Sequence, residues 1–170
     1  GAGRTAYLLL ELCAHGSLAH HLISLEGQPM ARNQVYRLFL DMAHALLHLH
    51  DQKPPIAHRD FKLENMLLAS DGFAKLCDFG SATCRSRSYH GSRREADWAE
   101  DEFHRMCTGL YRAPEMFDVH RGQVVSEKVD VWALGISFFR LACNKEAYTY
   151  GEERLGALNG TWRNRVPDGG

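Results

Sequence analysis

Apolar residues at helical spacing predict two helices, each with one apolar face, in this chain of 170 residues. The first run consists of Val35, Leu38, Phe39, Met42, Leu46 and Leu49. The second consists of Val129, Trp132, Ile136 and Phe139, and Ser126 before it is a residue type that caps helices. The apolar stretch around this second run contains Asp130 and Arg140 and is shorter than the roughly 20 apolar residues of a membrane span. We therefore expect a buried helix here and no membrane span.

Shorter apolar runs predict strands. Tyr7-Leu8-Leu9-Leu10 predicts a buried strand that ends at the turn residues after it. Farther along, Met66-Leu67-Leu68 and Phe73-Ala74-Lys75-Leu76 flank Asp71-Gly72, a dipeptide that readily adopts the positive φ angles of a tight hairpin turn. The middle of the chain is therefore expected to form a small β-hairpin.

The segment from Ser81 to Arg112 is polar and irregular. It contains a basic group, followed by an acidic one, namely Arg85, Arg87, Arg93 and Arg94 and then Glu100, Asp101 and Glu102. This composition predicts a long surface loop, which in a compact domain is usually functional or mobile. Its arginines could hold a phosphate or an acidic substrate, although a basic run in a loop is more often simply solvated.

Charge and cysteine content exclude several classes of protein. The formal net charge of -1 provides no basic field for nucleic acid, so no nucleic-acid partner is expected. The 5 cysteines are odd in number and form no CxxC pair, which argues against a disulfide framework or a structural zinc site and fits a reducing, cytoplasmic compartment. His44 and His48 have the spacing of a helical metal pair, but ordinary surface histidines are the stronger interpretation. The chain does not begin with Met, and we expect it to be truncated at both ends.

Three motifs occur in a fixed order: His58-Arg59-Asp60-Phe61-Lys62-Leu63-Glu64-Asn65, then Asp78-Phe79-Gly80, then Ala113-Pro114-Glu115. Together they resemble the catalytic loop, the metal-binding motif and the end of the activation segment of protein kinases. The resemblance implies an α+β, protein-kinase-like fold: a mainly helical C-terminal lobe with a small β-hairpin and no N-terminal lobe. It also implies a hinge at 10–13, a catalytic loop at 58–65, an activation segment at 78–115 and a central buried helix at about 127–143.

The resemblance assigns roles that fit the chemistry of phosphoryl transfer, which depends on positioning and charge neutralisation around a γ-phosphate. Asp60 would accept the proton of a substrate hydroxyl, and Lys62 would reach the transferred group. Asn65 and Asp78 would supply the oxygen ligands that Mg²⁺ prefers. Lys62 and Thr108 follow the serine/threonine-specific pattern, so serine and threonine side chains of proteins are the expected substrates. Taken singly, these residues are ordinary turn formers.

The expected ATP site also includes the hinge and the floor of the adenine pocket. Glu11 and Cys13 would bind adenine through their backbone carbonyl and amide, respectively, and Leu67 would lie beneath the ring. Cys77 would line the phosphate end, although a small buried hydrophobe is the plainer interpretation of this residue. Without the lysine and glutamate of an N-terminal lobe, we expect the isolated chain to be inactive.

Further expectations come from neighbouring residues. Asp130, Trp132 and Gly135 resemble the kinase signature in which the aspartate binds the backbone of the catalytic loop, and burial of Asp130 would require such a partner in any fold. Arg59 is the better candidate for contacting a phosphorylated activation segment.

The wider segments 53–60, 76–83 and 111–115 resemble the Numb-associated kinase family, whose members phosphorylate clathrin adaptor subunits in trafficking. That resemblance implies clathrin adaptors as partners and an extra helix within 116–125. A catalytically silent pseudokinase, acting as a scaffold, and a small-molecule phosphotransferase of kinase-like fold are the alternatives.

Overall fold

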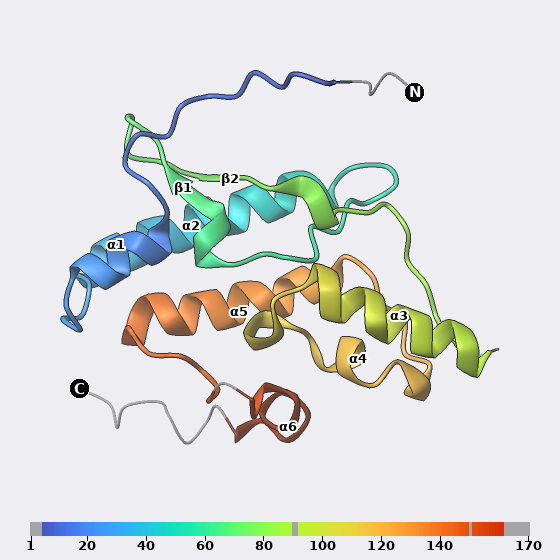
Figure 1. The fold of residues 1–170 in the computed structure, drawn as a ribbon. Coiled ribbons are helices and arrows are strands. Elements are labelled where there is room, and N and C mark those ends of the chain that lie inside the picture. Colours follow the sequence, from blue (N-terminus) through green and yellow to red (C-terminus); the bar gives the residue numbers. More distant parts are fainter. Residues whose placement is uncertain (1–4, 90–91, 150, 162–170) are drawn as a thin grey trace.

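A computed structural model describes residues 5–89, 92–149 and 151–161 of the chain. The expected truncation concerns the two chain ends, and these lie outside the described residues. The α-helices and β-strands of the described residues are α1 (Leu18–Ser24), α2 (Arg32–His50), β1 (Met66–Leu68), β2 (Ala74–Leu76), α3 (Arg93–Met106), α4 (Pro114–Phe117), α5 (Lys128–Cys143) and α6 (Glu153–Asn159). The fold is thus mostly helical with one small sheet (Figure 1), as the resemblance implied.

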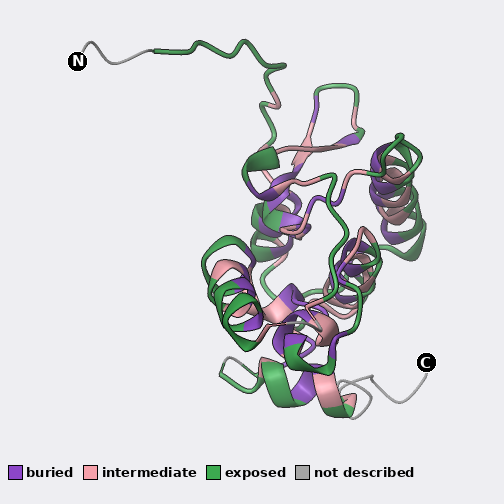
Figure 2. Ribbon diagram, turned by 90° about the vertical axis from the view of Figure 1, so that its right-hand side faces the viewer, coloured by how far each residue is buried: buried purple, intermediate pink, exposed green. Residues whose placement is uncertain are grey.

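Two helices, α2 and α5, form the centre of the molecule, and both were predicted from apolar spacing. Leu38 and Met42 of α2 and Leu141 of α5 are fully enclosed in the larger apolar core. The rings of Phe39 and Phe138 meet across the two helices at 4.7 Å between centroids. The predicted cap at Ser126 is wrong by one residue: the N-cap position of α5 is Glu127, which makes no side-chain cap hydrogen bond, and Ser126 before it accepts the backbone N–H of Lys128 at 3.3 Å. Buried residues are found on several helices, each of which also has exposed residues (Figure 2).

The predicted hairpin is confirmed, with a longer turn than the dipeptide suggested. Strands β1 and β2 are antiparallel, and Met66 pairs with Leu76. Gly72 has a φ of +83°, whereas Asp71 supports the turn through its carboxylate, which accepts the backbone N–H of Phe73 at 3.0 Å. The hairpin packs on α2, where Asp41 accepts the N–H of Ala74 at 3.0 Å.

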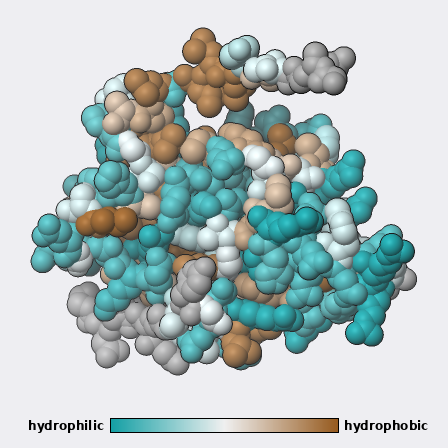
Figure 3. All heavy atoms as spheres, in the orientation of Figure 1, coloured by the Kyte–Doolittle hydropathy of each residue, from teal (hydrophilic) through white to brown (hydrophobic). Residues whose placement is uncertain are grey.

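The predicted strand at Tyr7–Leu10 is wrong. These residues are extended but unpaired, and the side chains of Tyr7 and Leu9 are 94% and 99% exposed. An apolar strand is stable only beside another strand or a core, and no described residue pairs with this one. The segment instead forms an apolar strip above the body of the molecule (Figure 3).

The predicted loop at 81–112 is also wrong in part, because α3 occupies nearly half of it. Ser92 accepts the N–H of Glu95 at 3.4 Å and caps this helix. One face carries Ala96, Ala99 and Phe103, which pack into a second apolar core with Val129 of α5. Two of these three residues are alanines, whose small side chains give only a weak apolar signal in the sequence.

The extra helix that the resemblance implied within 116–125 is not continuous. Helix α4 ends at Phe117, and a single 3-10 turn follows at Val119–Arg121. Both pieces lie against α3 through Met116 and Val119. Among the described residues, no helix is both long and apolar enough to cross a membrane.

Candidate active site

Residues 58–65, the expected catalytic loop, are held in place by Asp130, which is fully buried in the first turn of α5. Its carboxylate accepts the backbone N–H groups of His58 at 2.7 Å and Arg59 at 2.8 Å. His50 of α2 also lies against it, with 3.0 Å between Nε2 and Oδ2. The backbone partner expected for Asp130 is therefore present. Asp130 fixes the loop to α5, and His50 connects the same carboxylate to α2.

Asp60 is the centre of a compact polar cluster. Its Oδ1 accepts the hydroxyl of Thr108 at 2.7 Å and the backbone N–H of the same residue at 3.0 Å. Its Oδ2 accepts Lys62 Nζ at 2.7 Å and Asn65 Nδ2 at 3.3 Å. Lys62 also donates to the Thr108 hydroxyl at 2.7 Å. Four of the five residues expected to be catalytic thus share one cluster.

The remaining one, Asp78, stands apart at the start of the activation segment. Its backbone has a φ of +59° and its side chain is exposed, with Oδ1 accepting the N–H of Gly80 at 3.2 Å. The backbone connects it to the cluster, because Cys77 N donates to Asn65 O at 2.9 Å. Phe79 packs its ring edge against His58 with 5.3 Å between centroids.

Asp78 and Asn65 have the oxygen atoms that a magnesium ion would need. Asn65 uses only its Nδ2 in the hydrogen bonds within the described residues, and Asp78 uses only Oδ1. The Oδ1 of Asn65 and the Oδ2 of Asp78 therefore remain as hard oxygen donors, which suit Mg²⁺. Within the same residues, no three His, Cys, Asp or Glu side chains gather as a metal-binding group, so His44 and His48 are not part of one.

The expected hinge residues lie over the hairpin. Glu11 binds Lys75 of β2 through both carboxylate oxygens, at 2.6 and 2.8 Å. Lys75 is the register partner of Leu67, the residue expected beneath adenine. Neither the carbonyl of Glu11 nor the amide of Cys13 hydrogen-bonds another backbone group within the described chain, so both are available to a ligand.

Burial argues against a reactive role for the cysteine beside the site. Desolvation, with the neighbouring Asp78 charge as a second cause, raises the pKa of the Cys77 thiol. A reactive cysteine needs the opposite shift, because the thiolate is the nucleophile. The plainer interpretation of Cys77, as a small half-buried apolar residue, fits this environment.

Two arginines to which the sequence pattern assigned no role at the site support it. Arg112 is buried and donates to the carbonyls of Phe103 and Cys107 at 3.1 and 2.8 Å, which closes the end of α3. Burial lowers its pKa. Arg140 of α5 donates from Nη1 to Glu64 of the catalytic loop at 2.6 Å and to the Tyr111 hydroxyl at 2.7 Å. In the sequence, each of these arginines is marked only by its position next to apolar residues.

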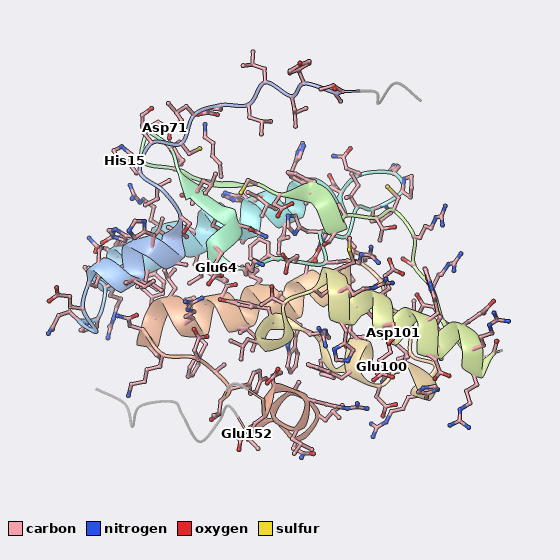
Figure 4. The ribbon with its side chains drawn as sticks, in the orientation of Figure 1. His15, Glu64, Asp71, Glu100, Asp101 and Glu152 are labelled. Atoms are coloured by element: carbon pink, nitrogen blue, oxygen red, sulfur yellow. The ribbon has the colours of Figure 1, made fainter. Side chains whose placement is uncertain are left out.

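In Figure 4, Glu64 faces α5 near the middle of the molecule, whereas Glu100 and Asp101 lie on α3. The acidic group of the 81–112 segment is therefore carried on a helix beside the catalytic loop. One member, Glu102, reaches Arg59, with 3.3 Å between Oε1 and Nη2. The contact expected between Arg59 and a phosphorylated residue is made here by a carboxylate.

Comparisons with known proteins agree with this geometry. The family model described as protein kinase domain matches residues 2–160. A probable serine/threonine-protein kinase of Dictyostelium discoideum is 37% identical over 95% of the chain, and a protein kinase domain-containing protein of Schizosaccharomyces pombe is 39% identical over 79%. A second Dictyostelium protein of the same description is 37% identical over 79% of the chain. The chain spans only 20%, 20% and 12% of the lengths of these relatives, respectively.

Proposed function

The chain belongs to the protein kinase domain family, and from this premise we propose that the full-length protein transfers the γ-phosphoryl group of ATP to serine and threonine hydroxyls of proteins. The observation that carries the proposal is the cluster in which Asp60 binds Thr108, Lys62 and Asn65. The relatives of this chain that are named as probable serine/threonine-protein kinases support the same substrate class.

In this mechanism Asp60 orients the attacking hydroxyl and accepts its proton, which is the role of a positioned carboxylate in general base catalysis. Lys62 lies 2.7 Å from Asp60 and carries the positive charge that the transferred phosphoryl group requires. Thr108 holds the segment that follows against the same carboxylate. A peptide lying along this segment would present its hydroxyl to Asp60.

Asn65 and Asp78 would hold Mg²⁺, and the hinge groups at Glu11 and Cys13 would bind the adenine of ATP, with Leu67 and Cys77 lining the pocket. The metal supplies neutralisation of the phosphate charge when it is bound. The backbone hydrogen bond from Cys77 N to Asn65 O, at 2.9 Å, joins the two segments that carry these ligands and supports their assignment to one site.

A narrower assignment is also part of the proposal. Resemblance to the Numb-associated kinase family, and within it to cyclin-G-associated kinase, suggests clathrin adaptor subunits as substrates and a cytoplasmic role in trafficking. It rests on the segments 53–60, 76–83 and 111–115. The broken helix within 116–125 is a departure from that family's pattern.

The test is transfer of radiolabelled phosphate from ATP by the full-length protein to adaptor-derived peptides containing serine or threonine. Asp60→Asn should reduce kcat by a factor on the order of 100 or more, since it removes the base but keeps the shape. Asp78→Asn should abolish transfer at ordinary magnesium concentrations. Binding of ATP without transfer to any of several substrates would instead favour the pseudokinase scaffold.

A further inference from the structure

Arg59 precedes Asp60 in the chain, and its guanidinium is held between two parts of the 78–115 segment. Nε donates to the carbonyl of Ser81 at 2.7 Å, and Nη2 donates to Glu102 of α3 at 3.3 Å. The side chains of Arg59 and Glu102 are only 13% and 23% exposed. A charge removed this far from water is costly unless an opposite charge accompanies it. Glu102 is the carboxylate that fulfils this role within the described residues.

The same pair is connected to the catalytic cluster through the end of α3. The Ser81 hydroxyl donates to the carbonyl of Met106, the last residue of α3, at 2.6 Å. Thr108 follows after one more residue and donates twice to Asp60. Two contacts, Arg59 with Glu102 and Ser81 with Met106, therefore fix the helix end from which Thr108 reaches Asp60.

Glu102 is delivered to Arg59 by a packed helix. Phe103, its neighbour in sequence, is 1% exposed and packs in the second apolar core together with Ala96 and Ala99. A side chain presented by a rigid element keeps its position at little entropic cost. The carboxylate is thus in place whenever α3 is folded.

The other cations of this region do not compete for the carboxylate. Arg85 and Arg87 line the same cavity of about 500 Å³ as Arg59, and among the residues that the structure describes Glu102 is the only acidic one in its lining. Both of these arginines are exposed, so water screens their charge and they need no partner. Arg59 is the cation that depends on Glu102.

We propose that Glu102 is a positioning residue: its carboxylate supplies to Arg59 the negative charge that phosphorylation supplies in other kinases. Activation-segment phosphorylation acts by pairing a new charge of about -1.5 to -2 with arginine. A glutamate needs no second enzyme to install it. The 78–115 segment therefore holds Thr108 against Asp60 in the unphosphorylated protein.

The first test measures order rather than activity. Full-length protein is treated with a phosphatase, mass spectrometry verifies that 81–112 carries no phosphate, and amide hydrogen exchange is followed from 96 to 108. We expect dephosphorylated wild type to keep its protection and Glu102→Gln to exchange about tenfold faster, the scale of a lost charged hydrogen bond. Asp101→Asn, the same change at the exposed neighbouring residue, should stay within about twofold of wild type.

A double variant separates pairing from general destabilisation. In an Arg59→Met background, Glu102→Gln should add less than about twofold to exchange, because the pair is already broken. Loss of protection in wild type on dephosphorylation would overturn the proposal, as would an unchanged exchange rate in Glu102→Gln. If Glu102→Gln changed the exchange rate equally in the wild-type and Arg59→Met backgrounds, Glu102 would act outside the pair, and the proposal would be overturned as well.

Activity supplies a second readout, which rests on the proposed kinase function. Dephosphorylated wild type should keep kcat within about twofold, and Glu102→Gln should lower kcat about tenfold while leaving KM for ATP unchanged. A kcat that collapses on dephosphorylation of wild type contradicts the inference. Absence of transfer in untreated wild type contradicts the kinase proposal instead, and the exchange experiment then decides the role of Glu102 alone.

Discussion

The carboxylate of Asp130 accepts the backbone N–H of Arg59 at 2.8 Å, and Arg59 has a φ of +66°, in the left-handed region that non-glycine residues seldom occupy. The surroundings must hold such a residue in place. Helix α5 therefore sets the backbone conformation of the residue that precedes Asp60, from a position 71 residues later in the chain.

Replacement of Asp130 should release this conformation. Asp130→Ala leaves the buried N–H groups of His58 and Arg59 without an acceptor, at about 1–3 kcal/mol for each unsatisfied group. Asp130→Asn keeps one acceptor oxygen and should cost less. Chemical denaturation of the full-length variants, followed by far-UV circular dichroism, measures both. Equal stability of Asp130→Ala and wild type would show that the loop does not depend on this contact.

The central elements were predictable because their signals are local and strong. Helix α2 repeats large apolar residues, and the hairpin has a glycine at its turn. The prediction of a strand at Tyr7–Leu10 was wrong because a run of apolar residues indicates burial but does not indicate which segment it would pair with. Helix α3 was missed because its buried face depends on Ala96 and Ala99, whose burial follows from what packs on them.

The α3 interpretation predicts that Phe103 is a core residue although it lies in a polar segment. Phe103→Ala should destabilise the domain by about 3–5 kcal/mol, through lost apolar burial and the cavity left behind. Trp98→Ala on the same helix is the control, because Trp98 is 56% exposed. Thermal unfolding of the two full-length variants compares them. Similar losses from both would mean that α3 does not pack through Phe103.

The candidate site was predictable only as far as short motifs extend. Asp60, Lys62 and Asn65 belong to one such motif, and Thr108 was expected at the site from the serine/threonine-specific pattern. The hydrogen bonds that join Thr108 to Asp60, 48 residues away in the chain, follow only from the fold. Glu102 was visible only as one acid among several. Glu102 differs from Asp101 in the direction in which its side chain leaves α3. That direction depends on how the helix packs.

Cysteine reactivity should follow burial in the activation segment. Burial raises the pKa of the Cys107 thiol to about 12, so a negligible share is thiolate at pH 8. Cys84 is exposed. Iodoacetamide at pH 8 should therefore modify Cys84 first, with Cys107 protected until the protein unfolds, as followed by peptide mass spectrometry. Modification of Cys107 at a comparable rate in native protein would contradict the packing of α3 over it.

The Arg140 cluster links the catalytic loop to the end of the activation segment. Nη1 of Arg140 donates to both Glu64 and Tyr111, and Nε lies 2.9 Å from Glu146. Tyr111 is buried, and desolvation raises the pKa of its hydroxyl, which therefore stays protonated. The phenol accepts from Arg140 as a neutral group.

Tyr111→Phe should lower the free energy of unfolding by about 1–2 kcal/mol. Arg140→Met should lower it by about 2–3 kcal/mol, because the carboxylates that Arg140 binds, Glu64 and Glu146, are partly exposed to water. The double variant should cost about 1 kcal/mol less than the sum, since the shared hydrogen bond is lost once. Arg121→Met is the control: this arginine is 66% exposed, pairs with Asp118 and should change stability by less than about 0.5 kcal/mol. Urea denaturation of the full-length variants measures all four, and strict additivity would show that Tyr111 and Arg140 are not coupled.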